Sequence, residues 1–350
     1  MESKRYDNGR ILLSAEWETQ SGIQLTWPHA ATDWAYMLDE VETCFVAIAR
    51  EIAARELLLI VTPERERVEA RIADEVNMEH VRWVDCATND TWARDHGGIT
   101  VWRDGEPYIY DFAFNGWGLK FAACYDNLIT SHCYKAGVFN AGYVNKLNFI
   151  IEGGSFESDG RGTLLVTSEC LLSPNRNGEW SRDKIESYLR TTFGLQRVLW
   201  LDYGYLAGDD TDSHIDTLAR FAPDNTILYV QCLDTADEHY EALQAMERQL
   251  RSFTPADGNF YRLLPLPMAR PVFDTDGQRL PATYANFLII NGAVLYPVYG
   301  SPQEDDAAGR VIAAAFPGRE IVPIDCRPLI CQHGSLHCVT MQYPAGVLKE

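Results

Sequence analysis

The feature of this sequence that most constrains its fold is a repeated pattern of two strands, a helix and a third strand. Three clear copies begin near residues 148, 215 and 284, which gives a period of roughly 65–70 residues. In each copy, two short apolar segments flank a turn rich in Gly, Pro, Asp or Asn, and a helical segment and a further apolar segment follow. Five such copies would fill the chain of 350 residues.

Two weaker copies precede these three. Radial repetition of small mixed units around an axis is the economical architecture for such a repeat, and an ordinary mixed α/β sandwich is the alternative. The first weak copy has a lone strand, a long helix and another strand, expected at 22–28, 33–55 and 56–61, with an insertion over 67–84. The second has strands expected at 97–102 and 107–112 and a helix near 119–137.

Composition excludes several classes of protein. The formal net charge of −20 argues against nucleic acid as a partner, because phosphate binding needs clustered Lys and Arg. The acidic excess serves either solubility or the attraction of a cationic substrate. Nine cysteines at irregular spacing suit a reducing cytosol. Because no segment is typical of a signal peptide or a membrane span, we expect a cytoplasmic protein that is not bound to a membrane.

The segment 208–221 places a histidine among four aspartates at the point where a loop is expected to become a strand. If residues 214–221 form that strand, His214 and Asp216 point to the same side, because residues two apart in a strand share a face. The alternative is a His–Asp pair on the surface.

Two further acids stand next to glycines. Asp95 follows a tryptophan and an arginine and precedes two glycines, an arrangement typical of functional loops, although it could also cap a turn. Glu152 follows the apolar segment 148–151 directly. A carboxylate that leaves a buried strand must be paired, unless it lies at the solvated tip of a hairpin.

The segment 331–338 contains Cys331, His333, His337 and Cys338, which are residue types that zinc prefers. With a strand expected over 335–342, the adjacent His337 and Cys338 would face opposite ways, and the sequence has no CxxC pair. We therefore predict no metal, and interpret the cysteine as a thiolate nucleophile. A cysteine, a histidine and several carboxylates suit attack on the carbon of a planar guanidinium cation.

Eight motifs resemble those of the agmatine deiminases, which belong with the bacterial peptidylarginine deiminases among the guanidine-modifying enzymes. The resemblance covers about residues 20–345 and implies a five-bladed α/β propeller, an α/β fold with a pseudo-fivefold repeat, and a single catalytic domain over 1–350. The motifs are WPH (27–29), WARD (92–95), FNGWG (114–118), IEGGSF (151–156), ECLLSPNRN (169–177), TDSHID (211–216), YANF with NG (284–292) and HC (337–338).

The resemblance also implies a role for each matching residue. Cys338 is the nucleophile, His214 the general acid and base, and Glu152 orients that histidine or holds the guanidinium. Asp95 and Asp216 clamp the guanidinium nitrogens. The substrate-binding residues that it implies are Trp92 and Trp117 as pocket walls, Asn286 near the site, and Asp210.

The implied reaction converts agmatine to N-carbamoylputrescine and ammonia through a thiouronium adduct on Cys338, in polyamine biosynthesis, without a cofactor. Departures from the family pattern at Asp210, Ser213, Gln332 and His333 make the substrate less certain than the reaction. Alternatives are a deiminase of peptidyl-arginine or another guanidine compound, an amidinotransferase, a non-catalytic guanidine or polyamine binder, and a zinc-binding structural module. The sequence is compatible with a homo-oligomer.

Overall fold

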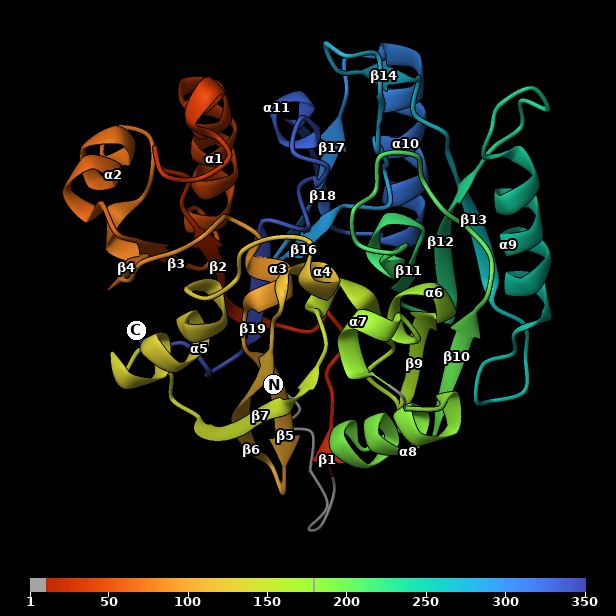
Figure 1. The fold of residues 1–350 in the computed structure, drawn as a ribbon, viewed down its shortest axis with the longest axis horizontal. Helices are drawn as coiled ribbons and strands as arrows, with labels where there is room; N and C mark the ends of the chain where they lie inside the picture. The colour runs from red at the N-terminus through yellow and green to blue at the C-terminus, as the bar shows by residue number, and fades with distance from the viewer. Residues whose placement is uncertain (1–10, 179) are drawn as a thin grey trace.

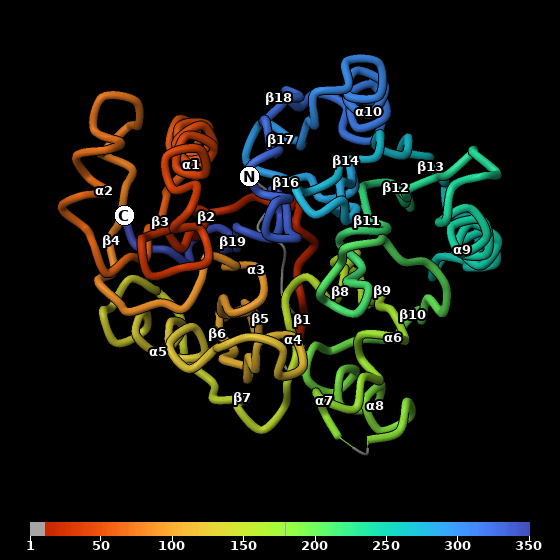
Figure 2. The backbone as a smooth tube through the Cα atoms, turned by 45° about the horizontal axis from the view of Figure 1, so that its top comes forward, coloured from red at the N-terminus to blue at the C-terminus, as the bar shows by residue number. Residues whose placement is uncertain are grey.

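The computed structural model of the protein describes residues 11–178 and 180–350 (Figure 1). It has a mixed α/β fold with five sheets of three or four strands and one two-stranded sheet. Figure 2 shows the five larger sheets arranged around the middle of the molecule, with α1, α5, α8, α9 and α10 on the outside. Within the described residues, no helix is long and apolar enough to cross a membrane.

The three clear repeats are confirmed as strand–strand–helix–strand units, but the first begins at Phe156 and not near 148, because residues 148–150 end a strand that pairs in another sheet. In each unit the first two strands pair antiparallel, and the third strand, after the helix, pairs parallel with the second. The units are β8 (Phe156–Ser158), β9 (Thr163–Thr167), α8 (Arg182–Phe193) and β10 (Arg197–Leu201); β11 (Ala219–Ala222), β12 (Thr226–Gln231), α9 (Tyr240–Ser252) and β13 (Arg262–Pro267); and β16 (Leu288–Ile290), β17 (Ala293–Val298), α10 (Pro302–Ala315) and β18 (Glu320–Asp325). The sequence predicts that the helix before β10 begins at residue 179, which lies outside the described residues.

The two weaker copies form the remaining large sheets. The lone strand of the first copy gains its partner from the other end of the chain, because β19 pairs antiparallel with β2. The predicted insertion adds a helix and a fourth strand to this sheet. Its elements are β2 (Gln20–Thr26), α1 (Leu38–Ala53), β3 (Leu57–Thr62), α2 (Arg65–Ile72), β4 (Val81–Asp85) and β19 (Thr340–Pro344). The other sheet contains β1 (Ile11–Leu12), β5 (Ile99–Arg103), β6 (Glu106–Ala113) and β7 (Gly142–Ile150), with α5 (Asp126–Lys135).

Short helical turns carry many of the loops between these elements. Four of them, α3, α4, α6 and α7, lie on the loops that approach the middle of the molecule (Figure 1). The turns are α3 (Ala93–His96), α4 (Gly116–Leu119), α6 (Ser168–Leu171), α7 (Pro174–Asn177), α11 (Arg327–Ile330) and the 3-10 turns Ala35–Met37, Met78–His80, Gly153–Ser155 and Ile215–Thr217. The two-stranded sheet is β14 (Val272–Phe273) with β15 (Arg279–Leu280).

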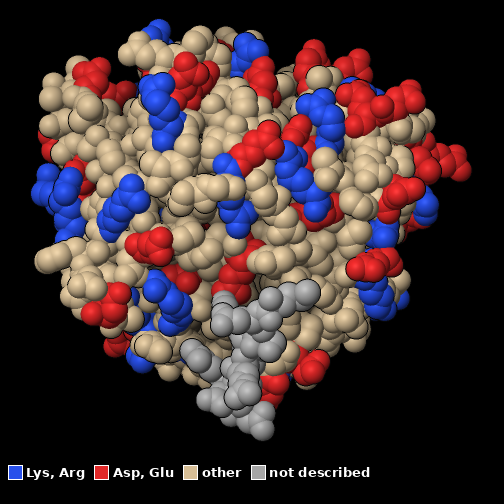
Figure 3. Space-filling view, turned by 180° about the vertical axis from the view of Figure 1, so that it is seen from behind, with Lys and Arg blue, Asp and Glu red and all other residues tan. Residues whose placement is uncertain are grey.

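The outer helices form where the sequence places apolar residues on one face. In α9, Leu243, Met246 and Leu250 are buried, and their spacing of three and four puts them on the same side of a helix. Polar residues such as Arg251 occupy the other side. On the face seen in Figure 3, the described Lys and Arg side chains are interspersed with acidic and uncharged ones.

Two expected strands begin later than the sequence predicted. The strand expected from His214 begins at Ala219, and the strand expected from 335 begins at Thr340. Both segments open with a tight turn in which a histidine carbonyl accepts hydrogen bonds from the backbone and the hydroxyl of the threonine three residues later. These side-chain hydrogen bonds compete with a strand ladder. His214 and Cys338 therefore lie on turns, and the expectation that they lie on strands was wrong.

The centre of the molecule contains a fully buried arginine, Arg220, on β11. Its guanidinium donates to Glu16, with an Nη2–Oε2 distance of 2.6 Å, and to Glu157. It also donates to the carbonyl oxygens of Ala285 and Phe287 at 3.1 and 2.7 Å. Glu16 precedes β2, Glu157 lies on β8, and Ala285 and Phe287 precede β16. Together with β11, which carries Arg220, this one side chain connects four of the sheets.

We predict that Arg220→Met lowers the free energy of unfolding by about 3–5 kcal/mol, because it leaves two buried glutamates without their cation. Arg251→Met is the control, since it removes an exposed ion pair and should change stability by about 0.5 kcal/mol or less. Denaturant unfolding measures both. Equal stability of the two variants would contradict the central role of Arg220.

Candidate active site

A strongly acidic pocket opens beside Cys338. Its described lining contains five aspartates and neither lysine nor arginine. Aromatic side chains form much of the rest of its wall, with the ring centroids of Trp92 and Trp117 6.4 Å apart in an edge-to-face arrangement. Such a lining favours a cation that carries an apolar stem. The aspartates are Asp33, Asp90, Asp95, Asp209 and Asp210, and the other lining residues are Trp92, Trp117, Phe121, Thr211, Thr217, Gln332, His333, Gly334 and Cys338.

Cys338 is buried on the turn before β19. Its Sγ lies 3.3 Å from Asn286 Oδ1 and 3.8 Å from Asp216 Oδ2. Asn286 Oδ1 also accepts the backbone N–H groups of His337 and Cys338 at 2.9 and 3.3 Å, so this amide holds the turn in place. Burial, together with the charges of Asp216 and Asp95, raises the pKa of the Cys338 thiol well above its usual value.

Asp216 presents one carboxylate oxygen without a partner. Its Oδ2 accepts from His337 Nδ1 at 2.8 Å and from Asn286 Nδ2 at 3.2 Å. Its Oδ1 is buried and has no hydrogen-bond partner in the part of the chain that the structure describes. Burial opposes the charge, but His337 and then His214 bring the pKa of Asp216 below its usual value. The carboxylate that contacts the thiol therefore keeps one buried, unpaired oxygen, which is suited to receive an N–H donor of a cation.

Asp95 lies on α3, on another side of the site. Its Oδ1 accepts the backbone N–H of Gly154 at 3.0 Å, and its Oδ2 accepts Trp117 Nε1 at 2.8 Å. Burial raises the pKa of Asp95 to about 6, with His214 acting in the opposite direction. Trp117 has a φ of 55°, so the hydrogen bond to Asp95 also holds the tryptophan in an unfavourable backbone conformation.

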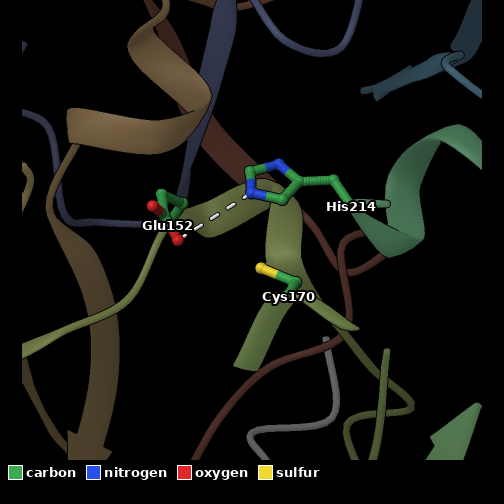
Figure 4. A group of neighbouring side chains, drawn as sticks. All are labelled: Glu152, Cys170 and His214. Atoms are coloured by element: carbon green, nitrogen blue, oxygen red, sulfur yellow. Dashed lines mark ion pairs between the residues drawn. The ribbon is translucent and has the colours of Figure 1, made fainter. Parts of the chain in front are cut away.

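His214 lies between two carboxylates, of which that of Glu152 is drawn in Figure 4. Its Nδ1 is 3.6 Å from Asp95 Oδ1, and its Nε2 is 3.8 Å from Glu152 Oε2. The sulfur of Cys170 lies near both Glu152 and His214 in the same view. Burial acts against the charged imidazolium, but Asp95, and after it Cys170 and Glu152, hold the pKa of His214 well above its usual value. These neighbours therefore favour the charged, proton-carrying form of His214.

Arg176 is a functional candidate that the sequence analysis missed. Its Nε lies 3.0 Å from each oxygen of Glu152, its Nη1 donates to Asp212 Oδ2 at 2.5 Å, and its Nη2 donates to the Thr211 carbonyl at 2.8 Å. Burial acts to raise the pKa of Glu152, but Arg176 and His214 bring it below its usual value. Glu152 is fully buried and paired, so the alternative of a solvated hairpin tip was wrong. The only sequence signal for Arg176 was its place in the motif at 169–177.

Three of the four residues that depart from the family pattern lie at the pocket mouth, and the fourth, Ser213, is bonded to Asp209 and Glu169. Asp210, Gln332 and His333 all line the pocket. The backbone oxygen of Asp210 accepts from Lys120 Nζ at 2.6 Å, and its carboxylate is 3.9 Å from His333 Nδ1. His333 Nδ1 also contacts the Gly208 carbonyl oxygen at 2.7 Å. The altered loop before Cys338 is thus anchored to the loop before His214.

Two groups of described side chains have the composition of a metal site. The ligand atoms of Glu152, Cys170 and His214 lie within 4.8 Å of one another, and so do those of Glu16, Glu157 and His337. Neither group matches the set of Cys331, His333, His337 and Cys338 that the sequence analysis considered for zinc.

The structure brings most of the predicted residues into one site. His214, Asp95 and Asp216 meet around Gly154, because a Cβ at that glycine would lie 2.6, 2.9 and 3.1 Å from their atoms. Cys338 adjoins this group through Asp216, and Glu152 adjoins it through His214. Trp92 and Trp117 form the wall, Asn286 lies behind Cys338 and Asp216, and Asp210 lies at the mouth.

Comparison with known proteins places the chain among deiminases. The family model of Porphyromonas-type peptidyl-arginine deiminases matches residues 12–344. The agmatine deiminase of Medicago truncatula is 31% identical over 362 residues, covering 95% of this chain and 96% of that protein. A crystal structure from Porphyromonas gingivalis, provisionally named an arginine deiminase, has 55% identity and a TM-score of 0.93, covering 97% of this chain and 100% of that one. A C. jejuni agmatine deiminase variant with substrate bound has 35% identity and a TM-score of 0.90, covering 99% and 100%.

We predict that Gly154→Ala weakens binding of a small planar cation such as methylguanidinium at least tenfold, because the new methyl group must displace His214 or a carboxylate. Calorimetric titration measures the affinity. Gly258→Ala is the control, since it adds a methyl group to a left-handed glycine in open space and strains a turn without reaching the pocket. Equal affinity of the two variants would contradict this geometry.

Proposed function

The chain belongs to the Porphyromonas-type peptidyl-arginine deiminase family, and on that premise we propose that it hydrolyses agmatine to N-carbamoylputrescine and ammonia. The observation that carries this proposal is a buried thiol, Cys338, in contact with the carboxylate of Asp216, whose other oxygen is buried and unpartnered among the described residues, beside an acidic pocket. Relatives that are named agmatine deiminases, and a related structure with substrate bound, support it.

In the proposed first step, Asp95 and Asp216 hold the guanidinium nitrogens and the Cys338 thiolate attacks the guanidinium carbon. A C–S bond forms, and the electron pair of one C=N bond moves to nitrogen. His214 then gives its proton to the nitrogen that departs as ammonia, leaving a cationic thiouronium adduct on Cys338. Glu152, held by Arg176, keeps His214 oriented toward this nitrogen.

In the second step, His214 takes a proton from water, and the resulting hydroxide attacks the adduct carbon. The C–S bond breaks and the proton of the added hydroxyl passes to the sulfur, which releases N-carbamoylputrescine and restores the Cys338 thiol and the His214 imidazolium. Each step uses only side chains of this chain and water. That no metal or organic cofactor takes part stays a prediction.

The raised pKa of Cys338 makes the nucleophile depend on the substrate. In the free protein, burial and two carboxylates keep the sulfur as a thiol. A guanidinium bound between Asp95 and Asp216 adds a positive charge beside the sulfur and lowers the pKa of the thiol. The proton leaves to solvent, so that the reactive thiolate forms when the cation is in place.

The pocket also favours agmatine over free arginine. The tetramethylene stem of agmatine would lie along Trp92 and Trp117, and its amine would point toward the aspartates at the mouth, Asp210 among them. The α-carboxylate of arginine would meet the same aspartates and be repelled. The alternative, a deiminase of peptidyl-arginine, is favoured by one observation, the match of residues 12–344 to the family model of Porphyromonas-type peptidyl-arginine deiminases.

We further propose that the five larger sheets are the blades of a five-bladed α/β propeller, and that the chain is one catalytic domain. The shared order of strands and the pairing of β19 with β2 support this. Nine unpaired cysteines support a reducing compartment such as the cytoplasm. A homo-oligomer and the absence of nucleic-acid binding stay predictions.

We predict ammonia release, and a product with the mass of N-carbamoylputrescine, from agmatine but not from free arginine or a blocked arginyl peptide. Cys338→Ala should abolish turnover, because no other group can form the adduct. Turnover of the peptide alone would support the alternative substrate. If no guanidine compound is turned over, the chain is a binder and the proposal fails.

We also predict that Asp216→Asn lowers the pKa of Cys338 in the free protein, because it removes the negative charge nearest to the sulfur. The pH at which iodoacetamide alkylates Cys338 at half its maximal rate should fall by about one unit, as followed by mass spectrometry of the Cys338 peptide. Asp210→Asn, at the mouth, should leave it unchanged. An unchanged or higher midpoint in Asp216→Asn would contradict the effect of Asp216.

A further inference from the structure

Cys170 is a buried thiol beside the site that the proposed reaction does not use. It lies on α6, directly after β9, and is fully buried. Figure 4 shows its sulfur close to Glu152 and His214, and the ligand atoms of the three residues lie within 4.8 Å of one another. A cysteine that served only to fill the core would not need a carboxylate and an imidazole at its sulfur.

The imidazole leaves one nitrogen free toward this sulfur. His214 Nε2 is buried and has no hydrogen-bond partner within residues 11–178 and 180–350. The distance from Nε2 to Glu152 Oε2 is 3.8 Å, which is too long for a hydrogen bond. It is close to the roughly 3.4 Å that separates two ligand atoms about 2.0–2.2 Å from one tetrahedral zinc ion. Small movements would bring all three atoms onto one ion.

The three donors select the kind of ion. A thiolate, an imidazole and a carboxylate suit zinc, whereas magnesium and calcium prefer oxygen alone. The charges of Glu152 and the Cys170 thiolate would balance a divalent ion. Arg176 contacts Glu152 through Nε and so orients this carboxylate from outside the ligand set, as second partners of metal ligands do.

The second group with the composition of a metal site, formed by Glu16, Glu157 and His337, is less suited to bind a metal ion. Glu16 and Glu157 both accept from the guanidinium of Arg220, and His337 Nε2 lies 3.0 Å from Arg220 Nη2. The arginine already supplies the positive charge there, so a metal ion would have to displace it. In the Glu152 group, only the carboxylate is bound to an arginine.

We propose that Glu152, Cys170 and His214 form a reversible zinc-binding site, and that zinc bound there inhibits the enzyme. The inhibition rests on the proposed function, because it acts through His214. The Cys170 thiol gives its proton to solvent and binds zinc as a thiolate. The His214 imidazolium gives its Nε2 proton to solvent and binds zinc through the freed lone pair. The zinc-bound ring can no longer rotate and keeps only its Nδ1 proton, whose loss would leave an imidazolate. His214 is then a much weaker proton donor toward the leaving ammonia.

Cobalt titration followed by absorbance tests the site without any need for turnover. Co²⁺ serves as the spectroscopic substitute for zinc, since a thiolate ligand produces a near-ultraviolet charge-transfer band. The Cys338→Ala variant should bind one equivalent of Co²⁺ and show this band, because Cys338 is not a ligand of the proposed site. The double variant with Cys338→Ala and Cys170→Ala should bind Co²⁺ at least tenfold more weakly and lack the band. The matched control is the double variant with Cys338→Ala and Cys133→Ala, which removes another buried cysteine and should retain the band. Cys170→Ser, which conserves the size of the side chain, replaces Cys170→Ala if that variant fails to fold.

Zinc inhibition of agmatine hydrolysis provides the second readout. Cys170→Ala should need at least ten times more zinc for half inhibition than the unmodified protein, with each protein compared with its own turnover in the absence of metal. A cobalt band that disappears with Cys338→Ala and persists in Cys170→Ala would overturn the proposal, as would failure of the unmodified protein to bind cobalt or zinc. If the protein binds metal but turns over no agmatine, the zinc site stands and its inhibitory role, together with the proposed function, fails.

Discussion

The hydrogen bonds of His337 are the interaction on which the rest of this structure depends. Its Nδ1 contacts Asp216 at 2.8 Å, and its Nε2 contacts Glu16 at 2.9 Å and Arg220 at 3.0 Å. The His337 ring thus links the buried ion pairs of Arg220, which join the sheets, to the carboxylate of Asp216 beside the Cys338 sulfur. Since His337 is the neighbour of Cys338 in the chain, the same contacts fix the turn that presents the sulfur. Folding and site geometry thus share one buried network, in which loss of any partner leaves a charge without compensation.

Backbone strain is concentrated around the pocket. Of the eight described non-glycine residues with positive φ, five lie on the loops at the site, and the other three lie in the turns at Asp104 and at 224–225. Side-chain contacts hold several of the five, such as Trp117 to Asp95, Asp212 to Arg176 and His333 to Gly208. These conformations persist because the surrounding contacts determine them. The five residues are Trp117, Leu119, Asp212, Ser213 and His333.

The repeat was predictable because it rests on local patterns. Alternating apolar segments, turn residues and helical spacing are properties of 20 or fewer neighbouring residues, roughly the length of one strand pair or helix. The units expected from 215 and 284 begin within four residues of those positions, and the unit expected from 148 begins at Phe156. The pairing of β19 with β2 was not predictable, since it joins opposite ends of the chain. The segments at His214 and Cys338 were wrongly expected to be strands, because positive φ and histidine–threonine hydrogen bonds gave no periodic signal.

By itself, the sequence determined the repeated units, the acidic balance and the set of reactive residue types, because these follow from composition and short-range order. Only the tertiary structure decided how those residues meet: that Glu152 is held by Arg176, that Asp216 leaves one oxygen unpaired, and that Cys170 lies against His214. The physical reason is that burial and pairing are properties of the packed molecule. A charge two hundred residues away in the chain changes the pKa of a side chain only once folding has removed the water between them.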